Sequence, residues 1–184
     1  MRAPIGDFAE ATPLPEVEEP LCPAVAAAVA TWTGRVPVDR LLWVDSDPER
    51  ADTAVFVETY GADLATASAN CVVIAGKRAG ETSLAAAVVL ATSRIDVNGV
   101  VRKQLGVRKA SFAPRETAVE ATGMEYGGIT PIGLPADWPL LLDPAVLELP
   151  HVLIGSGSRR GKLIVPGEAL SQLPGAVVVP GLGG

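Results

Sequence analysis

The densest group of residues with chemical potential is a glycine-rich loop at residues 127–135, Gly-Gly-Ile-Thr-Pro-Ile-Gly-Leu-Pro. Adjacent Gly127 and Gly128 permit left-handed dihedrals and let a ligand approach the backbone closely. Thr130 and Pro131 then fix an extended turn. The same residues also suit a tight connection between a helix and a strand. The loop is not a P-loop, because no Gly-Lys-Ser/Thr follows, and no strand leads directly into it as a dinucleotide fingerprint requires.

A second glycine-rich turn, at residues 155–158, follows an apolar run at 151–154 that predicts a strand. Backbone N–H groups of Gly155, Ser156 and Gly157, together with serine hydroxyls, could hold a carbonyl, carboxylate or phosphate oxygen. The competing interpretation is a plain β-hairpin.

Three further side chains could carry chemistry, and each has a structural alternative. Cys71 stands in an apolar run with no base near it in sequence, which favours a buried thiol over a nucleophile. His151 opens an apolar strand, which favours a structural histidine. Asp143 follows the strand predicted at 140–142, where it could orient a ligand or cap a helix beginning at Pro144.

The composition of the chain excludes several classes of protein. The chain has 184 residues, 48% of them hydrophobic and 20% charged, which excludes intrinsic disorder. Its net charge of −6 argues against a protein that coats nucleic acid by bulk electrostatics. Residues 1–70 hold 4 basic and 12 acidic side chains, whereas residues 71–184 hold 11 basic and 9 acidic ones. Two cysteines and a single histidine match neither a disulfide framework nor a zinc pattern.

Periodicity and turn signals predict an α+β fold in which strands outnumber helices. Helices are expected at 24–32, 51–60, 97–105, 114–123 and 168–173, and strands at 41–44, 71–75, 83–92, 107–112, 140–142, 152–154, 163–165 and 177–179. A turn at 76–80 joins two strands as a hairpin. We therefore expect a curved, mixed, largely antiparallel sheet or partial barrel flanked by helices.

The ends of the chain differ in composition from its middle. Residues 1–20 are rich in proline and glutamate and are expected to form a flexible arm, and residues 181–184 a tail, around one domain at 21–180. No apolar stretch approaches the roughly 20 residues that span a bilayer, and no secretory signal is visible. A soluble, cytoplasmic protein without a membrane partner is expected.

The order of these motifs resembles the YbaK/EbsC family of aminoacyl-tRNA deacylases, relatives of the editing domain of bacterial prolyl-tRNA synthetases. The matching pieces are Ser-Arg-Ile-Asp-Val at 93–97, Lys-Gln-Leu-Gly at 103–106, Thr-Gly at 122–123, the loop at 127–133, Leu-Leu-Asp at 141–143 and the turn at 155–157.

The resemblance implies hydrolysis of the ester that joins a wrong amino acid to the 3′ ribose of tRNA, most often tRNA for proline. It implies no metal, no cofactor and no covalent nucleophile, with a water attacking the ester carbonyl. By position, Gly127, Gly128, Thr130 and Pro131 would shape the amino-acid pocket. Gly155, Ser156 and Gly157 would form the other wall, with Asp143 nearby. A synthetase is a possible second partner.

One position departs from the family pattern. Family members commonly carry a lysine at the start of the first core strand, where this chain has Asn70. Asparagine offers a neutral hydrogen bond and no charge. We therefore expect a deacylase with an altered site, or a catalytically weak binding module for an aminoacyl-tRNA end or a protein partner. A pocket that serves an unrelated small ligand is the third alternative. Basic side chains at 102–115 and 159–162 are enough for weak, salt-sensitive contact with a tRNA end.

Overall fold

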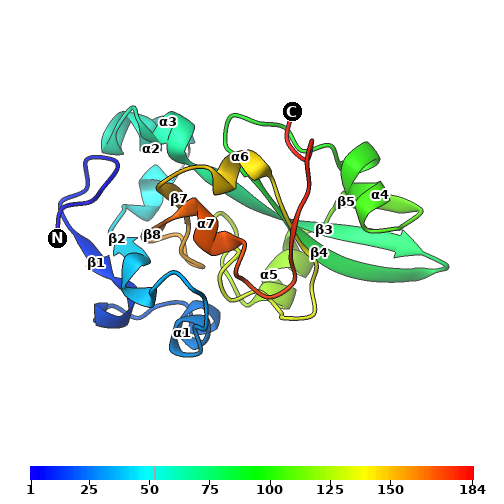
Figure 1. Cartoon of the computed structure of the whole chain (residues 1–184), viewed down its shortest axis with the longest axis horizontal. Helices are drawn as coiled ribbons and strands as arrows, with labels where there is room; N and C mark the ends of the chain where they lie inside the picture. The colour runs from blue at the N-terminus through cyan, green and yellow to red at the C-terminus, as the bar shows by residue number, and fades with distance from the viewer. Residues whose placement is uncertain (52) are drawn as a thin grey trace.

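The strands of the protein form two sheets surrounded by helices (Figure 1). The computed structural model describes residues 1–51 and 53–184. The first sheet is antiparallel and has the order β1 (Ala11–Pro13), β2 (Leu42–Val44), β8 (Lys162–Val165) and β7 (Val152–Gly155). The second has the order β5 (Lys109–Phe112), β3 (Ala69–Arg78), β4 (Glu81–Leu90), β6 (Leu140–Leu142) and β9 (Ala176–Val178). Because β4–β6 and β6–β9 pair in parallel, the second sheet is mixed and the predicted fold class is confirmed.

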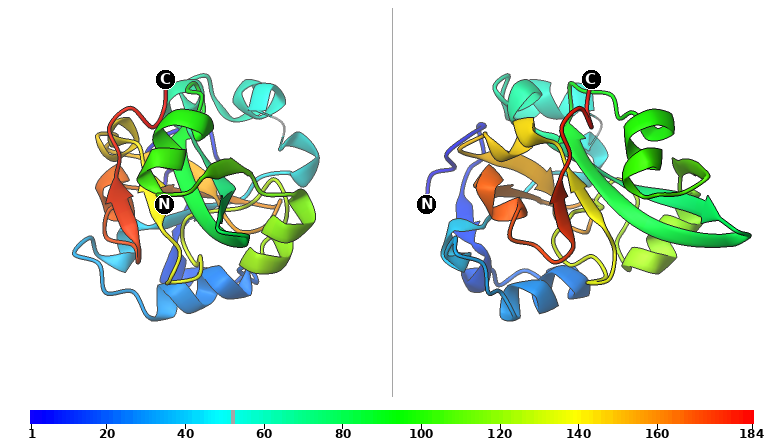
Figure 2. Two further views of the ribbon diagram at one scale, coloured as in Figure 1. Left: turned by 90° about the vertical axis from the view of Figure 1, so that its right-hand side faces the viewer. Right: turned by 45° about the vertical axis from the view of Figure 1, so that its right-hand side comes forward.

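The β3–β4 hairpin is the longest pairing in the fold and extends beyond the body of the molecule (Figure 2). Its turn consists of Ala79 and Gly80, whose φ angles are 51° and 83°. Positive φ at both positions matches the right-handed twist of the flanking strands. The sequence predicts a longer turn over residues 76–80, but the structure continues β3 through Arg78 because this two-residue turn suffices.

The two sheets meet at one place that matters for the site. Ser68, just before β3, forms an isolated parallel bridge to Leu153 of β7. The largest buried apolar cluster also draws on both sheets, with Val73 and Leu142 from one and Ile154 and Leu163 from the other. Shared burial holds the start of β3 against the end of β7, so walls built from these strands are fixed relative to each other.

Helices cover the sheets close to where the sequence predicts them. They are α1 (Pro23–Ala30), α2 (Thr53–Tyr60), α3 (Leu64–Ala67), α4 (Arg102–Gln104), α5 (Arg115–Thr122), α6 (Pro144–Leu147) and α7 (Gly167–Leu170). Short helical turns occupy η1 (Leu14–Glu16), η2 (Val38–Arg40), η3 (Pro48–Arg50) and η4 (Val97–Val101). Asp52, within the helix predicted at 51–60, lies outside the described residues. None of the described helices has the length and hydropathy needed to cross a membrane.

The N-terminal segment is integrated into the first sheet. Where the sequence predicts a flexible arm at 1–20, β1 pairs with β2, and Ala3, Phe8 and Leu14 are buried. The Phe8 ring stacks on Tyr60 with 5.1 Å between centroids. The apolar residues scattered among the prolines and glutamates are therefore enough to hold this segment in the core.

Candidate functional site

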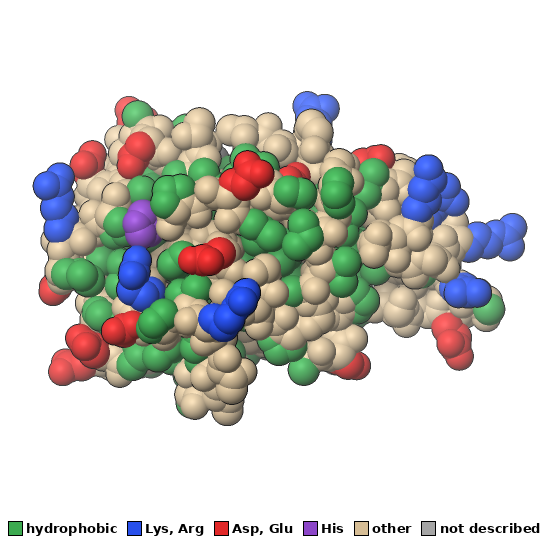
Figure 3. Space-filling model, in the orientation of Figure 1, with side chains coloured by type: hydrophobic (Ala, Val, Ile, Leu, Met, Phe, Trp, Pro, Cys, Tyr) green, Lys and Arg blue, Asp and Glu red, His purple; other side chains and the backbone are tan. Residues whose placement is uncertain are grey.

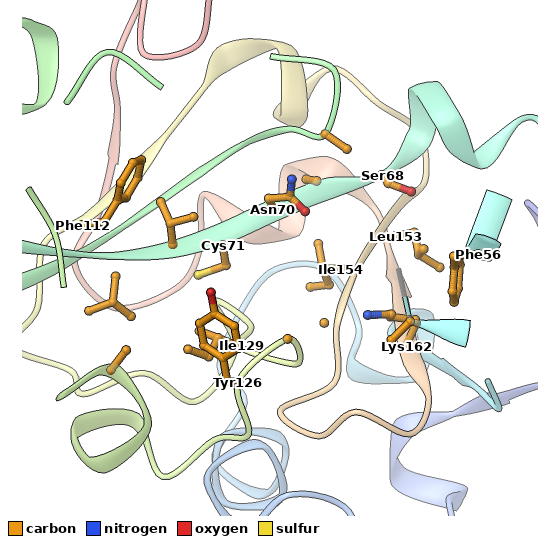
Figure 4. A pocket seen from close by; sticks show the side chains of 18 of the residues that line it. Phe56, Ser68, Asn70, Cys71, Phe112, Tyr126, Ile129, Leu153, Ile154 and Lys162 are labelled. Carbon is orange, nitrogen blue, oxygen red and sulfur yellow. The ribbon is translucent and has the colours of Figure 1, made fainter. Parts of the chain in front are cut away.

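A cavity of about 580 Å³ lies where the two sheets meet (Figure 4). The start of β3 supplies one wall, the end of β7 a second, and the loop after α5 a third. The lining residues with side chains of most chemical interest are Phe56, Ser68, Asn70, Cys71, Phe112, Tyr126, Ile129, Ile154 and Lys162. The site is thus a mainly apolar pocket with a few polar groups, the usual make-up of a small-ligand site.

Three residues predicted from the sequence line this cavity together. They are Asn70 on β3, Gly127 in the loop after α5 and Gly155 at the end of β7. Their positions in sequence are far apart, and the Ser68–Leu153 bridge brings the strands that carry Asn70 and Gly155 side by side.

The two glycine-rich loops pack backbone to backbone. Gly157 donates its N–H to the carbonyl oxygen of Gly128 at 2.7 Å, and Glu125 donates its N–H to the carbonyl oxygen of Gly157 at 3.0 Å. A Cβ at Gly128 would overlap the backbone of Ser158, and a Cβ at Gly155 would lie 2.5 Å from the Gly128 oxygen. Such distances leave no room for a side chain, so the close packing of these two loops requires glycine at positions 128 and 155.

Ser156 stabilises its own turn and does not line the cavity. Its buried hydroxyl lies 3.0 Å from the carbonyl oxygens of Arg160 and Gly161. Arg160 in turn pairs with Asp45 at 2.9 Å, and this contact lowers the pKa of the Asp45 carboxyl. The structure therefore places Ser156 as a support for the wall formed by Gly155, in contrast to the direct substrate contact that the sequence suggested.

The other predicted residues lie outside the lining of this cavity. Asp143 caps α6, because its carboxylate accepts the N–H groups of Ala145 and Gly183, each at 2.9 Å. Capping was the structural alternative for this residue. Thr130 is fully buried, and Pro131 lines a separate cavity of about 370 Å³ beside α1. The residues of the 127–135 loop thus serve two different faces, and only its beginning faces the main cavity.

Cys71 lines the cavity as a protonated thiol. Burial raises its pKa to about 12, so thiolate is scarce at neutral pH. His151 is not among the residues that line the cavity, and burial lowers its pKa. Neither residue has the surroundings of a nucleophile and its base. Among the described residues, no three His, Cys, Asp or Glu side chains gather as a metal-binding group.

Lys162 is the functional candidate that sequence reasoning missed. It is the one lysine or arginine among the described residues that line the cavity, and its Nζ lies 5.6 Å from the centroid of the Phe56 ring. Desolvation, with a smaller contribution from the charge of Arg159, lowers its pKa. In sequence it belongs to a basic run, but it also begins the buried strand β8. The sequence signal that could have identified Lys162 is a charged residue at the start of an apolar strand, close to a glycine-rich turn.

Pairing of β7 with β8 explains how Lys162 reaches the cavity. Gly155 and Lys162 are direct partners in the antiparallel ladder, so they lie on the same face of the sheet. Because Gly155 has no side chain, the face beside Lys162 stays open. The residues that line the cavity consequently include one cation, Lys162 from β8, and Asn70 from β3, both labelled in Figure 4.

Comparison with known proteins identifies the family to which this fold belongs. The profile of the aminoacyl-tRNA editing domain matches residues 47–173, more than half of the chain. The chain belongs to the aminoacyl-tRNA editing domain family. The resemblance to YbaK-type proteins is thereby confirmed, and the matched segment contains both glycine loops, Asn70 and Lys162.

Solved structures share the fold of this editing domain at low sequence identity. A candidate trans-editing enzyme for prolyl-tRNA synthetase is 22% identical, with a TM-score of 0.69 over 84% of this chain and 92% of that one. A scaffold protein used for epitope grafting is 21% identical, with a TM-score of 0.71 over 87% and 96% of the two chains. A hypothetical protein, APE2540, is 21% identical, with a TM-score of 0.64 over 79% and 91%.

Proposed function

We propose that this editing domain is a trans-acting deacylase that hydrolyses the ester of mischarged tRNA, of the tRNA-Pro type. The observation that carries the proposal is the cavity at the sheet junction, whose walls include Asn70, the paired glycine loops and a single cation. Membership in the editing-domain family supplies the substrate class. Such an enzyme would act in the cytoplasm, alongside or in association with a synthetase.

Direct hydrolysis fits the side chains of the cavity better than covalent catalysis. Cys71 is a thiol of raised pKa, and the Ser156 hydroxyl faces its own turn. In the proposed reaction, the oxygen of a water attacks the ester carbonyl. The bond from the carbonyl carbon to the ribose oxygen then breaks, and a proton from the water passes to that ribose oxygen. Gly127 and Gly155 bring the backbone close enough to hold the aminoacyl group during this step.

Lys162 is proposed to stabilise the negative oxygen that develops on the carbonyl. Its partial burial strengthens any contact with an anion, because the local dielectric is low. Asn70 would donate a neutral hydrogen bond from the facing strand. The positive charge that YbaK-type relatives carry at the Asn70 position would then come from β8 in this chain.

The apolar part of the cavity is proposed to select the amino acid by size. Val73, Ile129 and Ile154 line it together with the alanines Ala69, Ala113 and Ala118. An apolar wall of this kind admits small uncharged side chains and disfavours charged ones, which would lose their hydration.

A panel of mischarged tRNAs tests the proposal. Native protein would be incubated with each substrate, and free amino acid would be scored against a buffer blank. We expect hydrolysis of at least one mischarged tRNA-Pro and loss of that hydrolysis in Gly128→Val. Gly184→Val adds the same side chain where a Cβ meets no atom within 4 Å, and this matched control is expected to behave as native protein. Absence of hydrolysis across the whole panel would contradict the proposal.

A catalytically weak binding module is the second candidate function, and the neutral Asn70 is the observation that favours it. Such a module would bind an aminoacyl-tRNA end or a protein partner without releasing amino acid. Native hydrolysis well above the blank would exclude it, whereas binding of a mischarged tRNA without turnover would support it.

A further inference from the structure

Along the cavity edge of β3, the described strands leave a short opening. At the start of this edge β3 meets β7, where Ser68 bridges Leu153. Further along it meets β5, whose pairing begins at Ile74, and just before that the N–H of Ala113 donates to the carbonyl oxygen of Val73 at 2.9 Å. Between these two contacts the edge of β3 has no neighbouring strand.

The direction of the backbone groups places both polar groups of Cys71 on this open edge. The N–H and C=O groups of successive residues in a strand point to opposite edges. The carbonyl of Ser68 faces the β4 side, where it accepts the N–H of Ala91 at 2.8 Å, and the carbonyl of Val73 faces the β5 side. Cys71, two residues before Val73, therefore directs its N–H and C=O away from β4. No hydrogen bond joins either group to another described residue on that edge.

The opening lies in the wall of the cavity. Cys71, Val73 and Leu153 all line the cavity. Figure 4 shows Cys71 on β3 between Phe112 on one side and Leu153 on the other. A buried backbone N–H or C=O without a protein partner is normally satisfied by water or by a ligand. The cavity therefore offers one donor and one acceptor on the backbone of Cys71.

We infer that Cys71 pairs through its backbone with the aminoacyl group of the substrate, as one residue pairs with another in an antiparallel ladder. In such a pair the two residues exchange both N–H···O=C bonds. The α-ammonium of an aminoacyl ester would donate to the Cys71 carbonyl oxygen, and the ester carbonyl would accept the Cys71 N–H. The inference rests on the proposed function, because it names the groups that hold the ester while water attacks.

The length of the opening favours a single amino acid over a peptide. It spans about four residues of β3, or about 13 Å. A longer peptide would have to displace Leu153 or Ala113, which already contact β3. Facing side chains of an antiparallel pair lie on the same face of the sheet, so the substrate side chain would lie beside that of Cys71. Figure 4 shows this side chain on the side of β3 where Tyr126 and Ile129 lie.

The surface beyond the opening suits a nucleic acid attached to the aminoacyl group. Figure 3 shows lysine and arginine side chains gathered at the end of the molecule formed by the β3–β4 hairpin. Lys77 and Lys109 are direct partners there, on the same face of β3 as Cys71 and about 20 Å from it along the strand. Phosphates of an RNA that leaves the opening in this direction would meet these cations.

Two-dimensional ¹H–¹⁵N NMR of native protein with L-alaninamide tests the pairing, because this probe has an amino group and a carbonyl but no ester bond. The amide proton of Cys71 is expected to shift downfield and to exchange more slowly with solvent as the probe is added. Val72, whose N–H faces β4, is the internal control and should keep its exchange rate. Propionamide lacks the amino group and should bind about 10-fold more weakly.

Three results of this titration would overturn the pairing. A Cys71 amide that does not respond to L-alaninamide would show that water alone meets the open edge. Equal affinity for L-alaninamide and propionamide would remove the contact with the Cys71 carbonyl. Much tighter binding of tri-alanine, with shifts that extend to Ala69 and Val73, would indicate a peptide site instead.

Cys71→Pro tests the same donor in the reaction. Proline removes the N–H at position 71, which points away from β4, so the β3–β4 ladder keeps its hydrogen bonds. Deacylation is expected to fall on the order of 10²-fold, the usual loss when one donor to a developing oxyanion is removed. Val178→Pro is the matched control at native rate, because Gly175 and Val179 make the bonds to β6 and Val178 lies outside the cavity lining. A folded Cys71→Pro protein of native rate would contradict the pairing, and the titration of native protein decides the case if this variant does not fold.

The pairing and the proposed function fail separately. Hydrolysis of mischarged tRNA by native protein, without a response of the Cys71 amide to L-alaninamide, would remove the pairing and leave the deacylase. A Cys71 response without hydrolysis of any mischarged tRNA would remove the deacylase and leave a site that binds aminoacyl groups.

Discussion

The N–H of Gly157 donates a 2.7 Å hydrogen bond to the carbonyl oxygen of Gly128, and this bond joins the two glycine loops. Gly155, beside it, lies so close to Gly128 that neither position tolerates a Cβ without a shift of backbone. The wall of the cavity is thus a backbone surface whose shape depends on two glycines. Their absent side chains account for the density of glycine in this part of the sequence.

Substitution of Gly128 should damage both stability and activity. In Gly128→Ala the new methyl group would overlap the Ser158 backbone and separate the loops, at a cost of about 1–3 kcal/mol in the free energy of unfolding. Chemical denaturation measures this cost. Gly184→Ala is the matched control, because a Cβ there meets no atom within 4 Å. Equal stability of the two variants would show that the loops are not in tight contact.

Removal of the cavity cation should separate activity from stability. Lys162→Met is expected to lower the deacylation rate on the order of 10²-fold, the loss typical of removing one group that stabilises a developing oxyanion. Its free energy of unfolding should stay equal or rise, because a partly buried ammonium costs desolvation. Lys162→Arg retains the charge and should retain part of the rate. A Lys162→Met protein of native activity would rule out this role.

The pH dependence of the deacylation rate should follow the lowered pKa of Lys162. Below that pKa the ammonium of Lys162 is charged and supports the reaction. The deacylation rate, after subtraction of the uncatalysed rate, should therefore fall as the pH rises through the pKa of Lys162. This fall should occur at a pH below the usual lysine value of 10.5. Lys162→Arg should move the fall to higher pH. Because the folded pKa is below the unfolded one, native stability relative to Lys162→Met should rise over the same alkaline range. A flat profile in both proteins would contradict the assignment.

Variants that move the positive charge from β8 to β3 test whether Lys162 replaces the lysine that is absent at position 70. Asn70→Lys should give little or no gain in rate, because a second ammonium in the same cavity meets repulsion from Lys162. The double variant Asn70→Lys, Lys162→Met should recover much of the rate lost in Lys162→Met alone. A large gain in Asn70→Lys by itself would instead mark the native chain as a weakened enzyme.

Cys71→Ala should remain active. The thiol is protonated and takes no part in the proposed reaction, so its loss is expected to cost about 1 kcal/mol of stability and little rate. Deacylation assays with Cys71→Ala and Cys71→Ser check this. Inactivation of both variants, with native-like unfolding curves, would restore the nucleophile interpretation.

Sequence alone predicts those features that depend on local backbone chemistry. The glycine loops, the helix end at Gly123 with its φ of 67°, and the apolar runs of β3 and β4 are visible as residue types and spacing. Asn70 and Gly155 are also predictable as site residues, although nothing local shows that their strands touch. That contact depends on the pairing of Ser68 with Leu153, which is long-range.

The rest depends on tertiary contacts. Lys162 enters the cavity because β8 pairs with β7 and places it on the face of Gly155. Ser156 turns inward because the carbonyl oxygens of residues that follow it need a donor. The N-terminal segment joins the sheet because β2 offers a free edge to β1. Each of these outcomes is set by a partner far away in sequence or by the closure of a turn.

The most direct test of the central claim is the rate at which native protein releases amino acid from mischarged tRNA-Pro, compared with correctly charged tRNA-Pro. The account predicts first-order release from the mischarged substrate well above the buffer rate, sparing of the correct one, and loss of the release in Lys162→Met. Release at the buffer rate from every mischarged tRNA would contradict it.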